Sequence, residues 1–244
     1  LRGRFMFLVM SVLRVHLLPP AIRALRAALH SCLAEGGVVA GWAGRDLAAI
    51  EHHIEELAEL GVPRPTSVPL FYRIANNQLN QDAEIQVVGP HSSGEIEALV
   101  FAAEGRLFVG ISSDHTDRKL EAHSVALSKQ VCAKPAGGDA WELSEVEGHW
   151  DELVVRSWIE EGGERVLYQE GSLSSLRPPR DLIEGYLAAS QQAAFADGTA
   201  MTCGTVGAIG GIRAANTFEM ELYDPRLNRS LKHRYTLQIL PEVA

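Results

Sequence analysis

The sequence contains few cysteines and no concentrated positive charge. Its 22 Lys and Arg residues face 31 Asp and Glu residues, which gives a net charge of −9. No dense basic stripe is present to neutralise phosphates, so we expect no nucleic-acid partner. The cysteines stand far apart and form no Cys-x-x-Cys pair, which argues against a zinc site or a redox couple and indicates a reducing, cytoplasmic location: Cys32, Cys132 and Cys203.

The apolar run at residues 5–13 is too short to span a bilayer, so we expect no membrane partner. Arg2 and Arg4 before this run give it a superficial likeness to a signal peptide. Arg14 and His16 follow at once, however, and no small-residue cleavage site is clear. We therefore expect the protein not to be exported.

Several common catalytic and cofactor motifs are also missing. The sequence has no Gly-x-Gly-x-x-Gly and no phosphate loop with its lysine, which argues against nucleotide binding. It has no Gly-x-Ser-x-Gly nucleophile elbow. The run at residues 51–56 contains His52 and His53 but lacks the histidine that both zinc-protease motifs require at their last position.

The pattern of the chain predicts an N-terminal helical extension, residues 1–36, followed by one domain at residues 37–244. A helix is expected at residues 20–33, a strand at 38–40, and a second helix that begins at the N-cap Asp46 and ends at Gly61 and Pro63. Further helices are expected at residues 117–127 and 179–195. Strands follow strands more often than they alternate with helices, which predicts an α+β fold with a mainly antiparallel, β-rich body; the expected strands are 70–74, 84–88, 95–101, 107–111, 153–159, 165–168, 200–203, 217–223 and 235–240.

Two glutamates on one strand are the sharpest candidate for chemistry. The two-residue period of a strand places Glu95 and Glu97 on the same face as Leu99 and Phe101. If that face is buried, the two carboxylates repel each other and lose hydration, so that one is protonated or a cation lies between them. The alternative is an edge strand with both glutamates in water.

Asp114 follows the next expected strand and is a candidate third oxygen ligand. Oxygen-only ligation favours magnesium, manganese or calcium over zinc. The stretch at residues 112–118 is equally typical of a helix N-cap.

His53 and Glu56 lie three residues apart on the expected helix, as a general base and its orienting carboxylate would. His52 has an equal geometric claim to Glu56. The whole run is also typical of a solvated helix face.

The glycine-rich stretch at residues 203–211 is able to bring backbone amides close to an anion, and its alternative is a plain turn between strands. Cys203 has no base visible in the sequence, which argues against a nucleophilic role.

Taken in order along residues 38–240, these segments resemble the fumarylacetoacetate hydrolase superfamily. Residues 53–57 resemble its His-x-x-Glu-Leu helix turn, and residues 69–73, which end in Arg73, resemble its Pro-x-x-Phe-x-Lys strand. Glu95 and Glu97 resemble the Glu-x-Glu metal pair, and residues 114–118 resemble the segment that carries the third ligand. Residues 164–171 and 203–207 resemble the family's Gln-containing hairpin and its Gly-Thr turn.

The resemblance implies a β-rich mixed-sheet roll with flanking helices, and a homodimer. It implies a metal-dependent hydrolase of C–C bonds in a small 2-oxo acid of the acylpyruvate or fumarylacetoacetate type. Mg²⁺ or Mn²⁺, with Ca²⁺ as a further candidate, is then held by Glu95, Glu97 and Asp114. The alternatives are a decarboxylase, hydratase or isomerase on the same fold, or a non-catalytic binding protein.

The resemblance also assigns roles to individual residues. His53 and Glu56 are the implied catalytic pair, and Lys129, with Lys134 as its competitor, is the implied pocket lysine. The implied substrate-binding residues are Arg73, Gly204 and Thr205. The connection between Glu97 and Asp114 is shorter than is usual in the family, which puts the position of Asp114 in doubt.

Overall fold

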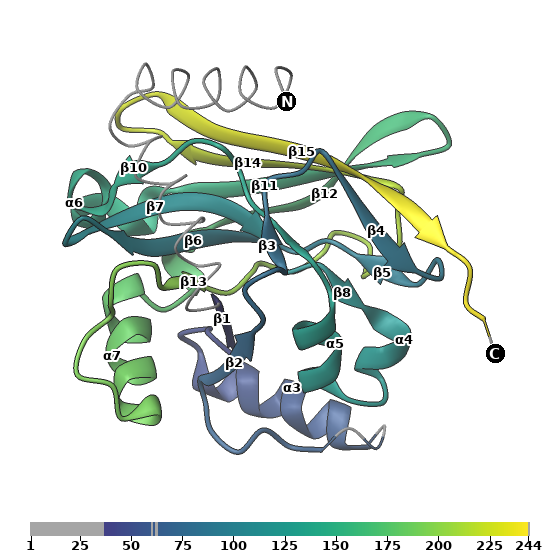
Figure 1. Ribbon diagram of the computed structural model, residues 1–244, viewed down its shortest axis with the longest axis horizontal. Coiled ribbons are helices and arrows are strands. Elements are labelled where there is room, and N and C mark those ends of the chain that lie inside the picture. Colours follow the sequence, from purple (N-terminus) through teal and green to yellow (C-terminus); the bar gives the residue numbers. More distant parts are fainter. Residues whose placement is uncertain (1–36, 60, 62, 244) are drawn as a thin grey trace, which may run out of the picture.

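The computed structural model describes residues 37–59, 61 and 63–243, and Figure 1 shows two larger sheets stacked above a group of helices. The first sheet has six strands in the order β10-β7-β6-β13-β1-β2, and the second has five in the order β12-β11-β14-β15-β4. The strands of the first sheet are β1 (Gly37–Gly41), β2 (Leu70–Ile74), β6 (Ile96–Ala103), β7 (Arg106–Ser113), β10 (Trp141–Glu142) and β13 (Ala200–Thr202). Those of the second are β4 (Glu84–Val88), β11 (Val154–Glu161), β12 (Glu164–Ser172), β14 (Thr217–Asp224) and β15 (Arg229–Leu240).

The sheets are mainly antiparallel, as the sequence predicted, with parallel pairing of β1 with β13 and of β15 with β4. Two small ladders join β3 (Leu79–Asn80) to β9 (Lys134–Pro135) and β5 (Ser92–Ser93) to β8 (Thr116–Asp117). The α+β, β-rich architecture is therefore confirmed.

Every residue of β6 is buried, and β6 lies inside the six-stranded sheet between β7 and β13. The edge-strand alternative for this segment is therefore wrong. A two-residue turn, Glu104 and Gly105, joins β6 to β7, and both residues have positive φ, as a tight hairpin of this kind requires. Residues pair across the hairpin from Ala103 with Arg106 to Ile96 with Ser113.

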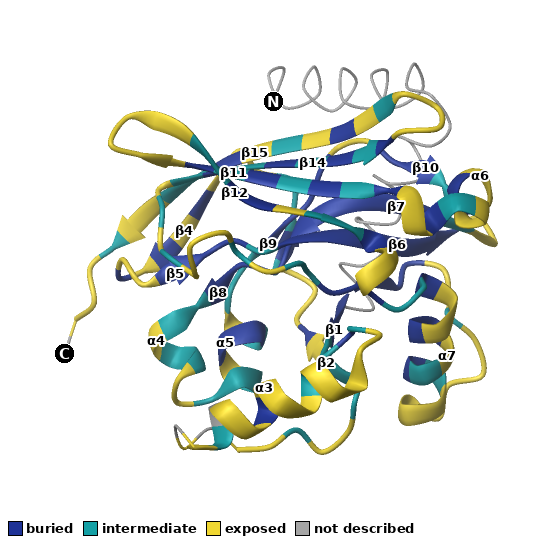
Figure 2. Cartoon of the chain, turned by 180° about the vertical axis from the view of Figure 1, so that it is seen from behind, coloured by how far each residue is buried: buried dark blue, intermediate teal, exposed yellow. Residues whose placement is uncertain are grey.

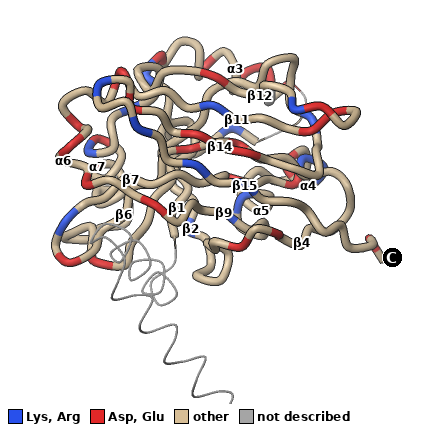
Figure 3. Tube along the Cα trace, turned by 90° about the horizontal axis from the view of Figure 1, so that it is seen from above, with Lys and Arg blue, Asp and Glu red and all other residues tan. Residues whose placement is uncertain are grey.

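The second sheet packs one face on the first and leaves the other to solvent. Alternate residues of β14 are buried, and β11 and β14 carry dark stripes in the burial view of Figure 2. Inward-facing side chains such as Met220 and Leu222 join Val100 and Val109 of the first sheet in one apolar cluster. On this sheet, acidic and basic residues are interspersed (Figure 3) and pair across strands, as Arg165 does with Glu219 at 2.8 Å.

In Figure 1, α3 (Leu47–Glu59) lies below the six-stranded sheet, beside β1 and β2. Asp46 caps α3, because its Oδ1 accepts hydrogen bonds from Ala48 N and Ala49 N at 3.0 Å each. Shorter helical segments include α6 (Leu143–Val146) and two 3-10 turns, Glu147–Glu152 and Leu173–Ser175.

Two expected helices are corrected. Residues 117–127 do not form one helix but contribute to two, α4 (Arg118–Glu121) and α5 (Val125–Val131), because Ser124 adopts an extended conformation and caps α5 through its side chain. The helix expected at 179–195 is α7 (Pro179–Ser190) and ends earlier, where Gln191 takes a left-handed conformation.

The helix expected at residues 20–33 lies outside the described residues. Within the described part of the chain, no helix has the length and apolar character needed to cross a membrane.

Candidate metal centre and cavity

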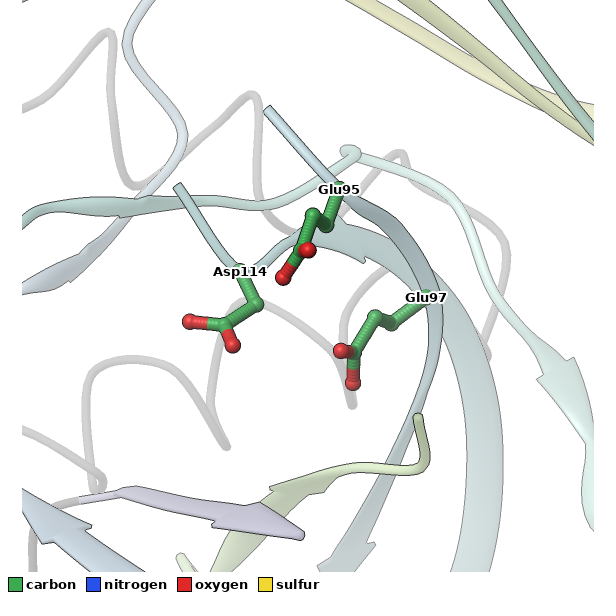
Figure 4. Close-up of side chains that lie close together, drawn as sticks. All are labelled: Glu95, Glu97 and Asp114. Atoms are coloured by element: carbon green, nitrogen blue, oxygen red, sulfur yellow. The ribbon is translucent and has the colours of Figure 1, made fainter. Parts of the chain in front are cut away.

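Glu95, Glu97 and Asp114 converge at one end of the β6–β7 hairpin (Figure 4). One carboxylate oxygen from each lies within 4.8 Å of the other two. The hairpin register explains this arrangement: Ile96 pairs with Ser113, so the next residues outward, Glu95 and Asp114, face each other, and Asp114 N donates to Glu95 O at 2.9 Å. The short connection between Glu97 and Asp114 therefore still brings Asp114 next to the two glutamates.

Cationic side chains surround two of these acids. Lys129 Nζ lies 2.7 Å from Asp114 Oδ2 and 3.0 Å from Glu95 Oε2, and Lys134 Nζ lies 2.9 Å from Asp114 Oδ1. Burial raises the pKa of Asp114, but the two ammonium groups outweigh burial and hold this pKa at about 2. The pKa of Glu95 is likewise lowered, because Lys129 and Arg118 outweigh the effect of burial.

Glu97 is different because none of these cationic side chains lies within ion-pairing distance of it. Its side chain is buried, and its Oε2 accepts a hydrogen bond of 2.7 Å from Gly204 N. Burial, and then the charge of Asp114, raise the pKa of Glu97 to about 8. A nearby cation would stabilise the ionised form of this carboxyl group and so lower its pKa.

These residues fit a hard divalent cation. All candidate donors are carboxylate oxygens, which magnesium, manganese and calcium prefer. Each carboxylate offers about four acceptor positions, so the contacts to Lys129, Lys134 and Gly204 N leave capacity for a metal ion. Glu97 is the acid whose charge is least compensated by the chain itself.

A cavity of about 520 Å³ opens beside the three acids, within the range of about 300–1,000 Å³ that is usual for small-molecule sites. Lys129, Gly204 and Thr205 line it, as the sequence predicted for a pocket. Lys134 does not line it and is fully buried behind Asp114, so Lys129 is the lysine that faces the cavity.

His53 also lines the cavity, and its ring centroid lies 5.9 Å from that of Trp42. Glu56 Oε2 lies 3.3 Å from His53 Nδ1, and Glu56 Oε1 lies 3.4 Å from His52 Nε2. Both histidines are largely exposed, so α3 is also a solvated face, but of the two only His53 lines the cavity.

Arg73 requires a correction. Its side chain is exposed, is not among the residues that line the cavity, and donates from Nη1 to the Tyr186 hydroxyl at 3.3 Å. Side chains alternate along β2, so it is the neighbouring Tyr72 that lines the cavity. The sequence alone predicts that Tyr72 and Arg73 point to opposite faces of this strand, but it does not indicate which face lines the cavity.

Sequence reasoning did not assign a role to Gln169, which joins the parts of the site. This buried side chain of β12 accepts at Oε1 from Ile96 N at 3.1 Å and from Ser157 Oγ at 2.9 Å. Its Nε2 donates to Thr205 Oγ1 at 2.9 Å and to Val206 O at 2.7 Å. Thr205 Oγ1 in turn donates to Ile96 O at 2.6 Å.

Gln169 therefore ties the backbone between Glu95 and Glu97 to the turn that contacts Glu97. The backbone of that turn requires glycine at position 204, where φ is +88° and an added Cβ would lie 2.8 Å from Ala43 Cβ. Cys203 beside it is buried, which raises the pKa of its thiol and supports the expectation that it is no nucleophile.

Arg118 and Glu121 were likewise not proposed as site residues, although Arg118 belongs to the segment on which the resemblance rests. Both line the cavity, where Arg118 Nη2 lies 3.1 Å from Glu95 Oε1. Their spacing of three residues, with opposite charges, was the signal available in the sequence.

Comparison with known proteins identifies a family and a fold. A family model described as "Protein of unknown function (DUF2848)" matches residues 40–235. No curated protein sequence is significantly similar to the chain.

Solved structures align over most of the chain. A 2-keto-3-deoxyarabinonate dehydratase in a hexagonal crystal form has a TM-score of 0.62 at 16% identity, over 85% of this chain and 75% of its own. The 2-keto-3-deoxy-D-arabinonate dehydratase in complex with magnesium and 2,5-dioxopentanoate has a TM-score of 0.59 at 15% identity, over 85% and 74%. Cg1458 has a TM-score of 0.58 at 15% identity, over 85% and 76%. These similarities show that the chain shares its fold with these proteins, and they confirm the mixed α+β fold class expected from the sequence.

Proposed function

This chain belongs to the DUF2848 family, and we propose that it is a metal-dependent enzyme that hydrolyses a C–C bond in a small 2-oxo acid of the acylpyruvate or fumarylacetoacetate type. The observation that carries the proposal is the convergence of Glu95, Glu97 and Asp114 beside a cavity that His53 and Lys129 also line. The proposed metal is Mg²⁺ or Mn²⁺, with Ca²⁺ as a further candidate.

A divalent cation at the three acids would polarise the ketone of the substrate and stabilise the negative charge that develops there. Lys129 supplies a positive charge for the substrate carboxylate on the same side of the cavity. Gly204 N donates to Glu97, and the Thr205 hydroxyl donates to Ile96 O at the start of β6. Both residues therefore keep the acids in place beside the substrate.

The proposed role of His53 is to take a proton from water. Its Nδ1 faces Glu56, which leaves Nε2 for that proton. The water oxygen bonds to the carbonyl carbon of the acyl group, and the C–C bond next to it then breaks. The electron pair of that bond stays with the carbon attached to the 2-oxo acid, which finally receives the proton.

A second candidate is elimination or decarboxylation at the same site. It is favoured by the structural similarity to a 2-keto-3-deoxy-D-arabinonate dehydratase, whose structure holds magnesium and 2,5-dioxopentanoate. These reactions need no hydrolytic water, so they do not require a base that activates one.

The test is turnover of a panel of acylpyruvates, oxaloacetate and 2-keto-3-deoxy sugar acids with Mg²⁺ or Mn²⁺, and then with chelator. We expect metal-dependent hydrolysis of an acylpyruvate that Glu97→Ala abolishes. Glu84→Ala, at an exposed position of β4 outside the cavity, is the matched control and should retain activity.

His53→Ala separates hydrolysis from decarboxylation, because it should abolish the first and spare the second. Elimination also needs a base to take the proton next to the ketone, so its dehydrated product identifies it. Binding of these acids without turnover of any of them would contradict the enzyme proposal and favour a binding protein. The homodimer and the cytoplasmic location remain predictions, and light scattering tests the first.

A further inference from the structure

Beyond the buried acids, the cavity wall is mainly apolar. Val125 of α5 and Ile212 of the loop before β14 lie on this wall, and Ile212 is 56% exposed. The apolar and aromatic side chains that line the cavity include Trp42, Ala43, Tyr72, Val125, Leu176 and Ile212. A substrate with its 2-oxo acid end at the acids therefore places the rest of its length against apolar surface.

Each cationic side chain of the wall already has carboxylate partners within the chain. Arg118 Nη1 lies 2.7 Å from Glu121 Oε2, and its Nη2 lies 3.1 Å from Glu95 Oε1. Lys129 contacts Asp114 and Glu95 at 2.7 and 3.0 Å. Lys129 Nζ also lies 3.9 Å from Glu121 Oε1. Among the described residues that line the cavity, each Lys or Arg side chain thus has at least two carboxylate partners.

The overall balance points the same way. Four carboxylates, those of Glu95, Glu97, Asp114 and Glu121, face the three cationic groups of Arg118, Lys129 and Lys134. A divalent cation leaves a single positive charge, which matches one substrate carboxylate. A second carboxylate would be desolvated beside apolar side chains without a partner.

We propose, building on the proposed function, that the substrate is a monocarboxylic 2-oxo acid with an apolar tail, and that Glu121 sets this preference by holding Arg118. Glu121 is the specificity-determining residue because its carboxylate occupies the guanidinium of Arg118, which would otherwise be available to a second carboxylate of the substrate. Val125 and Ile212 supply the apolar contact for the tail.

A neighbouring hollow is lined by basic residues, but these too have partners. It shares Arg118, Glu121 and Ile212 with the cavity and adds Lys119 and Arg213. Lys119 Nζ lies 2.7 Å from Glu242 Oε1, and Arg213 pairs with Glu161. A carboxylate at the end of the substrate tail would have to displace these contacts in order to bind in this hollow. Tight binding of a dicarboxylic acid is therefore the outcome that competes with the proposal.

The test is calorimetric binding of two acids of equal length, 2-oxooctanoate and 2-oxooctanedioate, to the Mn²⁺-loaded protein. Neither has a second ketone, so neither is a substrate for hydrolysis. We expect the monocarboxylic acid to bind about tenfold more tightly or better, because its terminal methyl group is buried favourably while a terminal carboxylate is desolvated.

Two variants should change this preference. Glu121→Gln leaves Arg118 with one carboxylate fewer and should reduce the ratio of the two dissociation constants several-fold, while Val125→Lys should reverse it. Glu147→Gln is the matched control: its carboxylate pairs with Arg180 at 2.7 Å, outside both cavities, and the ratio should stay as in the unmodified protein.

Equal or tighter binding of the dicarboxylic acid by the unmodified protein would overturn this inference and leave the proposed function intact. A ratio that Glu121→Gln does not change would overturn the role of Glu121. If neither acid binds with or without Mn²⁺, the proposed function fails and the inference fails with it.

Discussion

Replacing Gln169 by leucine tests how the acids are held in place. Leucine is similar in size to glutamine, but it leaves Ile96 N–H and the Ser157 hydroxyl without the acceptor that Gln169 Oε1 provides. A buried donor that loses its partner costs about 1–3 kcal/mol, and two such losses in one network are not fully additive. We expect the free energy of unfolding to fall by about 3 kcal/mol, measured by urea denaturation without metal.

The same variant should weaken metal binding more than a general loss of stability would. Ile96 lies between Glu95 and Glu97, and Gln169 connects it through Thr205 to the turn whose Gly204 N–H contacts Glu97. We expect the dissociation constant for Mn²⁺, measured by electron paramagnetic resonance on the folded protein, to rise about tenfold or more, as for residues that orient metal ligands.

Gln86→Leu is the matched control, because Gln86 is exposed on β4 and its Nε2 donates to Gln238 Oε1 at 2.7 Å. It should change neither quantity. A Gln169→Leu protein that is less stable but binds Mn²⁺ as tightly as before would refute the reasoning, because Gln169 would then act only on the fold.

Three further predictions concern the acids and the turn. Because the pKa of Glu97 is raised to about 8, a metal ion must displace a proton from Glu97 below that pH. The apparent Mn²⁺ affinity should therefore rise about tenfold per pH unit from pH 6 to pH 8 and level off above pH 8. An affinity that is flat over this range would show that Glu97 is not a ligand. Asp114→Asn takes the carboxylate at 2.9 Å away from the buried ammonium of Lys134 and should cost about 3–5 kcal/mol in urea denaturation, and a loss below 1 kcal/mol would contradict the buried pair. Gly204→Ala, at φ +88°, should lower stability by about 1–3 kcal/mol and raise the Mn²⁺ dissociation constant, whereas an unchanged constant would exclude Gly204 from positioning Glu97.

The sequence predicted those parts of the site that depend on local periodicity. The alternation along β6 placed Glu97 with Leu99 and Phe101, and helical spacing placed His53 next to Glu56. The position of Asp114 depends on the hairpin register. Counting residues outward from the Glu104-Gly105 turn along both strands would have predicted that Asp114 lies opposite Glu95.

The remaining features depend on contacts between distant segments, which local patterns do not contain. Gln169 reaches Thr205 only because β12 and the turn after β13 come together in the fold. The break between α4 and α5 is set by the side-chain cap at Ser124, which competes with a continuous helix in a way that propensity alone does not decide. Arg73 was assigned to the cavity because the resemblance did not specify which face of β2 points inward.

The tight turn at Glu104 and Gly105 also limits how this hairpin can change in length. Glu95 lies nine positions before Glu104, and Asp114 lies nine positions after Gly105, so equal arms bring the two acids opposite each other. A single insertion in one arm would turn the later side chains to the other face of the sheet. Growth by the same number of residues in both arms would leave the acids opposed, so the tip is a place where related chains, or an engineer, can add length without disturbing the metal ligands.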